Sequence, residues 1–174
     1  MESLLVSTGV VALAEIGDKT QLLAFVLAAR FKRALPVVLG ILVATLLNHG
    51  LAGAVGTWIG ALLQPGVLRW VVGVSFIAMA LWVMVPDRLE DETEFALQRF
   101  GVFGTTLLVF FLCEMGDKTQ VATVALAAHY AGAMLLVVAG TTLGMLIADV
   151  PAVFLAEPMP APCPSRMFTA VPAM

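Results

Sequence analysis

The chain has 174 residues, of which 61% are hydrophobic and 12% charged, and its mean hydropathy is +1.02. A soluble domain is about 45–50% apolar and about 25% charged, so this composition disfavours a soluble fold and indicates an integral membrane protein. The net charge of −3 excludes the basic surface that nucleic-acid binding requires. The lipid bilayer is therefore the first partner that the sequence predicts.

Five apolar stretches are long enough to cross a hydrocarbon core of about 30 Å, which takes about 20 helical residues. They are residues 4–29, 35–63, 67–85, 102–128 and 133–155. The sequence thus predicts an all-α membrane protein with five spans. Gly56 and Gly60 lie four residues apart in the second span, a spacing of small residues that lets membrane helices approach closely.

An internal repeat divides the chain into two halves of similar design. The octapeptide AEIGDKTQ at residues 14–21 returns as CEMGDKTQ at residues 113–120. We expect a first repeat of three spans at 1–86, a charged linker at 87–100, a second repeat at 101–156 and a proline-rich tail at 157–174. Three spans per repeat is an odd number, so the second copy would enter the membrane inverted, as in many secondary transporters.

Two inverted repeats of three helices require six spans, and the sixth helix is absent from this prediction. Prolines at positions 158, 160, 162, 164 and 172 prevent a continuous helix in the tail, which we expect to be disordered. A truncated or frame-altered C-terminus would explain this. The alternative is a natural tail, with a second copy of the chain completing the fold as a homo-oligomer. Both explanations stay open.

The positions of basic residues predict how the chain is oriented in the membrane. Arg30, Lys32 and Arg33 follow the first span, and Arg88 and Arg99 lie in the linker. Because cytoplasmic loops carry an excess of lysine and arginine, the linker is predicted to be cytoplasmic and the N-terminus to lie outside.

Each copy of the repeated motif places a glutamate, an aspartate and a lysine near the middle of a span. They are Glu15, Asp18 and Lys19 in the first copy and Glu114, Asp117 and Lys118 in the second. A charged group in lipid costs about 2.5–3.5 kcal/mol on insertion scales, so these residues are functional candidates. On a continuous helix all three share one face, whereas Thr20 points elsewhere. Gly17 and Gly116 remove side-chain bulk next to the acids, which allows either close helix contact or local unwinding.

The charge and chemistry of these six residues favour a divalent cation. Four carboxylates and two lysines leave a net charge of −2 if the two copies meet at mid-membrane. Carboxylate oxygens suit Ca²⁺, Mg²⁺ or Mn²⁺, and the sequence lacks the Cys/His spacing of a zinc or copper site. The lysines would hold the acids ionised when the site is empty. The alternative is that each Glu–Lys pair only ties helices together.

Further polar residues in the spans are supporting candidates. An amide oxygen of Gln21 or Gln120 is a further ligand, and Asp149 is a fifth carboxylate or a proton carrier. His49 is either a transport residue or a polar residue satisfied between helices. The other supporting candidates are Asn48, Thr20 and Thr119.

The doubled motif resembles the E-x-G-D-[KR]-[TS] signature of the Gdt-type cation/proton exchangers, here at residues 15–20 and 114–119. The resemblance covers about residues 4–155 and implies a six-helix core that exchanges Mn²⁺ or Ca²⁺ for protons, with manganese favoured. It implies that the cation ligands are Glu15, Asp18, Glu114 and Asp117, with no permanently bound cofactor. Bacterial relatives resemble manganese exporters, which implies the bacterial inner membrane.

Two other functions are alternatives to a secondary transporter. Asp18 and Asp117 would form the dyad of an intramembrane aspartyl protease, in which two acids share one proton. A lysine directly follows each aspartate and disfavours this enzyme, so we expect a transporter. A passive cation channel is the other alternative.

Overall fold

The computed structural model describes residues 1–83, 100–156 and 158, and this part of the chain is built of helices and connecting turns, without a strand. The elements are α1 (Glu2–Glu15), α2 (Lys19–Phe31), α3 (Ala34–Leu62), α4 (Pro65–Val83), α5 (Gly101–Glu114), α6 (Lys118–His129), the 3₁₀ turn η2 (Ala131–Ala133) and α7 (Met134–Ala156). The predicted all-α fold is confirmed over these residues. The predicted linker and tail lie outside them, apart from residues 100 and 158.

The first and fourth predicted spans are each broken at the repeated motif, so of the two possibilities at Gly17 and Gly116 the structure shows local unwinding. α1 ends at Glu15 and α2 begins at Lys19, and α5 and α6 are separated in the same way. Gly17 and Gly116 adopt left-handed backbone angles, with φ of 82° and 78°. Glycine adopts this conformation without the steric penalty of a Cβ atom, which explains its place in both copies.

In the part of the chain that the structure describes, three helices, α3, α4 and α7, are each long and apolar enough to cross a membrane by themselves. They correspond to the second, third and fifth predicted spans. The other two predicted spans consist of the pairs α1–α2 and α5–α6, whose members are shorter. For these two pairs, crossing of the membrane stays a prediction.

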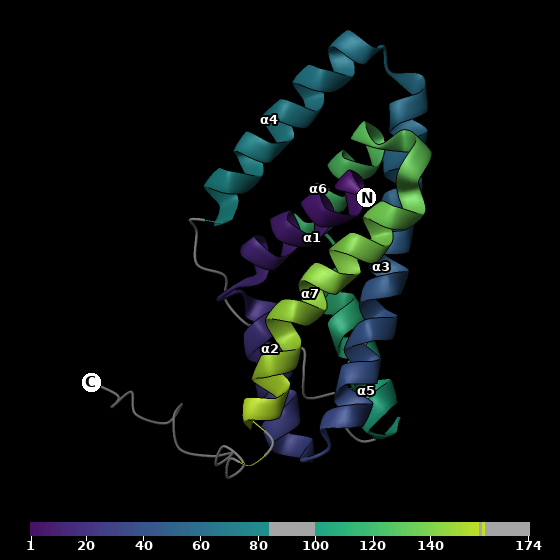
Figure 1. Ribbon diagram of the computed structural model, residues 1–174. Coiled ribbons are helices and arrows are strands. Elements are labelled where there is room, and N and C mark those ends of the chain that lie inside the picture. The colour runs from purple at the N-terminus through teal and green to yellow at the C-terminus, as the bar shows by residue number, and fades with distance from the viewer. Residues whose placement is uncertain (84–99, 157, 159–174) are drawn as a thin grey trace, which may run out of the picture.

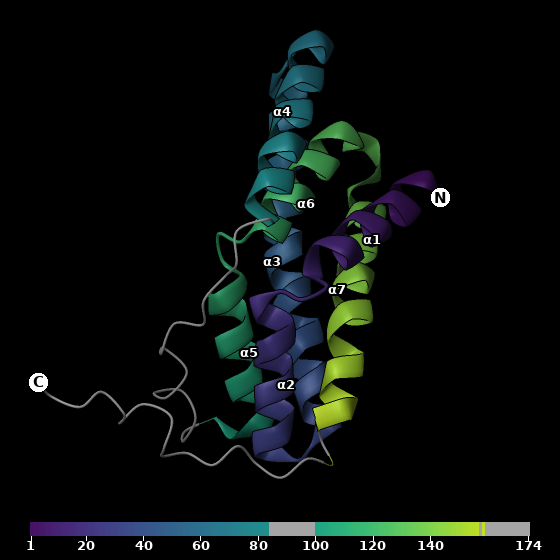
Figure 2. The same cartoon turned by 90° about the vertical axis from the view of Figure 1, so that its left-hand side faces the viewer.

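The long helices α3 and α7 each support the broken pair of the other half of the chain. α3 runs along the bundle and packs against α5 and α6, while α7 packs against α1 and α2 (Figures 1 and 2). A Cβ atom on Gly56 would lie 2.3 Å from the carbonyl oxygen of Val124, and one on Gly60 would lie 2.7 Å from that of Ala128. The predicted close approach of helices at these glycines is confirmed between α3 and α6.

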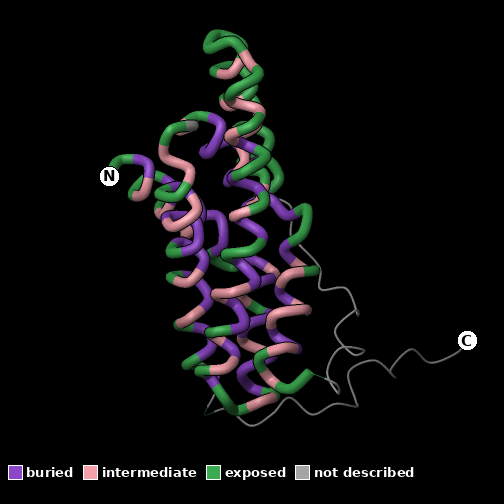
Figure 3. Tube along the Cα trace, turned by 90° about the vertical axis from the view of Figure 1, so that its right-hand side faces the viewer, coloured by how far each residue is buried: buried purple, intermediate pink, exposed green. Residues whose placement is uncertain are grey.

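The buried residues lie inside the bundle (Figure 3), and α4 projects from it (Figure 1). Leu27, Ile41, Phe110 and Val153 belong to one apolar core cluster, which joins α2, α3, α5 and α7. Most apolar side chains of α4 are exposed, including Trp70 at 78%. Exposed apolar side chains of this kind are suited to contact with lipid.

Candidate metal centre

Each of the two helix breaks contains an equivalent hydrogen bond. The N–H of Gly17 donates to Gln21 Oε1 at 2.9 Å, and the N–H of Gly116 donates to Gln120 Oε1 at 2.8 Å. Gln21 Nε2 also donates to the carbonyl oxygen of Ala148 in α7, at 2.9 Å. The amide oxygens that the sequence suggested as cation ligands therefore hold the turns in which the motif aspartates lie.

The lysine of each copy pairs with the aspartate of the other copy. Lys118 forms an ion pair with Asp18, and Lys19 Nζ lies 3.0 Å from Asp117 Oδ1. Lys118 and both aspartates are almost fully buried, whereas the side chain of Lys19 is 21% exposed. The two copies thus meet inside the bundle, as the sequence predicted, and they do so through two crossed ion pairs.

Three carboxylates gather where the two breaks meet. One oxygen from each of Glu15, Asp18 and Asp117 lies within 4.8 Å of the other two, and all three residues are buried. Oxygens that bind one Ca²⁺ at 2.3–2.6 Å lie at most about 5 Å apart. The three side chains are therefore close enough to bind the same cation.

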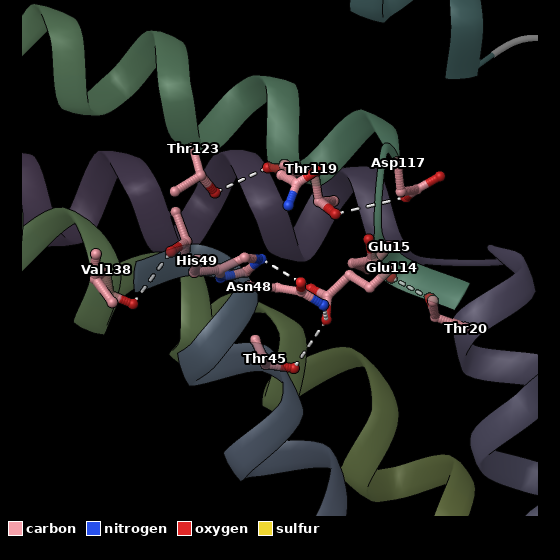
Figure 4. Close-up of polar contacts among 12 residues, drawn as sticks. Glu15, Thr20, Thr45, Asn48, His49, Glu114, Asp117, Thr119, Thr123 and Val138 are labelled. Carbon is pink, nitrogen blue, oxygen red and sulfur yellow. Dashed lines mark hydrogen bonds and ion pairs between the residues drawn. The ribbon is translucent and has the colours of Figure 1, made fainter. Parts of the chain in front are cut away.

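The fourth predicted ligand, Glu114, lies outside this group of three and is held by α3 (Figure 4). His49 Nε2 lies 2.9 Å from Glu114 Oε1, close enough for an ion pair but without hydrogen-bond alignment. Asn48 Nδ2 and Thr45 Oγ1 donate to Glu114 Oε2 at 3.4 and 3.5 Å. Sequence reasoning missed Thr45, although its spacing of three and four residues from Asn48 and His49 places all three on one helix face.

Glu15 has a different partner from Glu114. The hydroxyl of Thr20 donates to Glu15 Oε2, in contrast to the expectation that Thr20 points elsewhere. The expectation failed because it assumed a continuous helix, and the break turns Thr20 back towards Glu15. The equivalent Thr119 instead donates to Asp117 Oδ2 at 3.5 Å. The two copies therefore share their backbone turn but differ in how their acids are bound.

Asp149 lies on α7 and is fully buried. Among the described residues, neither of its carboxylate oxygens has a hydrogen-bond partner. The charges of Glu114 and Asp18 lie within electrostatic reach of it. Its assignment as a fifth carboxylate or a proton carrier stays a prediction.

Apolar helices of membrane-spanning length around a buried acidic cluster are typical of membrane proteins that transport cations. The family model described as "Divalent cation/proton antiporter GDT1" matches residues 3–91 and 102–174, and the chain belongs to this family. A Vibrio cholerae serotype O1 protein (strain ATCC 39541 / Classical Ogawa 395 / O395) named "Putative manganese exporter" is 46% identical over 157 residues, which cover 90% of this chain and 78% of the relative. No solved structure matches the chain.

Family membership confirms the resemblance seen in the doubled signature and identifies the chain as a divalent-cation transporter. The chain is not an enzyme, so the aspartyl protease alternative is wrong. The crossed pairs give a physical reason, because each aspartate is bound by a lysine of the other copy, whereas the two acids of a protease dyad bind each other through a shared proton.

Proposed function

We propose that the chain exchanges Mn²⁺ for protons across the bacterial inner membrane, with Ca²⁺ as the alternative cargo, and that Glu15, Asp18 and Asp117 bind the cation. The observation that carries the proposal is the three-carboxylate group at the meeting point of the two helix breaks. Oxygen ligands suit both Mn²⁺ and Ca²⁺, and the name of the Vibrio relative favours manganese.

The packing supports an inverted-repeat architecture for this transporter. α1–α2, α3 and α4 make up the first repeat in this proposal, and α5–α6 and α7 belong to the second. The reciprocal packing of α3 and α7 on the broken helices of the opposite repeat is what a pseudo-twofold axis would produce. Broken helices that meet near the centre of two repeats are a recurring design of secondary transporters.

Competition between metal and protons for the same carboxylates supplies the coupling. The cation binds to the ionised acids from the cytoplasmic side, the repeats rock, and protonation of the acids releases it outside. Glu114 is a nearby acid that Asn48 and His49 of α3 hold in place. In this proposal it binds the cation as the repeats move. The name of the Vibrio relative favours export as the direction of metal transport.

Proteoliposomes with an internal pH reporter test the proposal. Mn²⁺ uptake should drive proton movement in the opposite direction, with comparison assays in Ca²⁺ and Mg²⁺. Glu15→Gln and Asp117→Asn should each abolish the flux, because each removes a buried carboxylate of the group. Glu2→Gln is the matched control, because Glu2 lies on the same helix as Glu15 and is exposed.

Three outcomes would contradict parts of the proposal. Transport retained in both Glu15→Gln and Asp117→Asn would refute the ligand assignment. Mn²⁺ flux without proton counterflux would favour the passive channel. Proton-coupled flux of Ca²⁺ without flux of Mn²⁺ would replace manganese with calcium as the cargo.

A further inference from the structure

The crossed ion pairs place two positive charges on the same aspartates that belong to the proposed cation site. We propose that Lys19 and Lys118 are tethered counter-cations that the cargo must displace, and that they restrict the cargo to divalent ions. This inference rests on the proposed function and concerns the ion selectivity of the same site.

The lysine nitrogens and an entering cation compete for shared ligands. Asp18 and Asp117 each contribute an oxygen to the three-carboxylate group, and each also pairs with a lysine of the opposite copy. Lys118 and Asp18 are both nearly fully buried. In this setting solvent screens the pair less than at the surface, so the ammonium group is a strong competitor for the carboxylate.

The charges of the group explain why a divalent ion is favoured. The three gathered carboxylates and the ammonium groups of the two lysines sum to a net charge of −1, and the carboxylate of Glu114 makes this −2. The buried side chains of Asp149 and His49 also lie close to the group. A monovalent cation carries the same charge as one tethered ammonium group and therefore gains nothing by replacing it. A trivalent cation brings more positive charge than the group can balance while both lysines stay near.

Lysine is suited to this role by its chemistry. Its ammonium group is a compact charge on a flexible four-carbon stem, so it can leave one carboxylate while the rest of the helix stays in place. Lys19 is 21% exposed and Lys118 only 4%. We therefore expect removal of the Lys118 charge to have the larger effect.

The experiment compares the selectivity of single-lysine variants of the full chain in proteoliposomes. Mn²⁺ uptake is measured with La³⁺ or Na⁺ as the competitor in wild type, Lys118→Met, Lys19→Met and Lys118→Arg. Lys32→Met is the matched control, because it removes the same charge from an exposed position at the end of α2. Binding is measured in parallel as the shift in melting temperature caused by Mn²⁺ or La³⁺.

Lys118→Met should strengthen inhibition by La³⁺ relative to the KM for Mn²⁺ by about tenfold or more, because one unit of positive charge leaves a buried site. It should also lower both KM and kcat for Mn²⁺, because the competitor that helps to expel the ion is gone. Lys118→Arg keeps the charge and should keep the selectivity. Lys19→Met should show the same changes to a smaller extent.

A role limited to joining the two copies would leave the La³⁺/Mn²⁺ ratio unchanged, and an unchanged ratio in both lysine variants would overturn the inference. Failure of both lysine variants to fold would also overturn the inference, because it would show that the ion pairs serve to hold the helices together. If a variant folds without transporting, the ratio of the two thermal shifts decides. A wild-type chain that transports no divalent cation would refute the proposed function itself.

Discussion

Replacement of Gly56 by alanine tests the contact between α3 and α6, the helix that carries Lys118 at its start. A Cβ atom at position 56 would lie 2.3 Å from the carbonyl oxygen of Val124 and 2.9 Å from Ala127 Cβ. The nearest atom belongs to the backbone, so a change of side-chain rotamer cannot relieve the clash. Gly50 lies on the same helix with nothing within 4 Å of its Cβ position and provides the control.

The magnitude follows from two opposing effects. Ordinary van der Waals contact for a Cβ atom begins at 3.4 Å, so α6 would have to move by about 1 Å to accept alanine at position 56. Such overpacking costs about 1–3 kcal/mol, while alanine in a helix interior is favoured over glycine by about 0.5–1 kcal/mol. Gly50→Ala should gain the second contribution without the first, so the two variants should differ by about 2 kcal/mol.

Thermal unfolding in detergent measures this difference. For a chain of this size about 1 kcal/mol shifts Tm by about 2–4 °C, so Gly56→Ala should melt at least about 4 °C below Gly50→Ala. Its Mn²⁺ transport should also fall, because a displaced α6 moves Lys118 away from Asp18. Equal melting temperatures, or a higher one for Gly56→Ala, would show that α3 and α6 do not approach this closely.

Three further predictions concern the site. Thr20→Val should lower Mn²⁺ transport about tenfold or more, because it removes the buried hydrogen bond from the Thr20 hydroxyl to the Glu15 carboxylate. Thr123→Val is the control and should leave transport nearly unchanged, because it removes only a hydrogen bond to a backbone carbonyl of the same helix. Gly17→Ala should be less stable than Gly9→Ala by about 1.5–3 kcal/mol. The left-handed backbone at position 17 costs alanine about 1–2 kcal/mol, and alanine inside α1 at position 9 gains about 0.5–1 kcal/mol; equal unfolding free energies would refute this. Mn²⁺ at about 100 times its Kd should raise the Tm by about 5–10 °C, because a ligand that binds only the folded state stabilises it by about 2.7 kcal/mol at this concentration. Asp18→Asn should remove this shift. A shift retained in the variant would exclude Asp18 as a ligand.

The helix breaks were within reach of sequence reasoning. Gly17 is a residue that commonly ends a helix, and Asp18 is one that commonly precedes the first turn of the next. The apolar stretch continues through the motif at full spanning length, so the side-chain directions were still worked out on a continuous helix. The direction of Thr20 was wrong for this reason, because the helix is broken there.

By itself, the sequence determined that the chain is helical, belongs in a membrane and carries one acidic motif twice, because composition, apolar length and repetition are properties of the chain alone. Only the tertiary structure decided which charges meet. Each lysine binds the aspartate of the other copy, and Glu114 is held by α3 apart from the three gathered carboxylates. The physical reason is that these contacts join residues about 65 to 100 positions apart, and helix packing around the two breaks, not local spacing, brings them together.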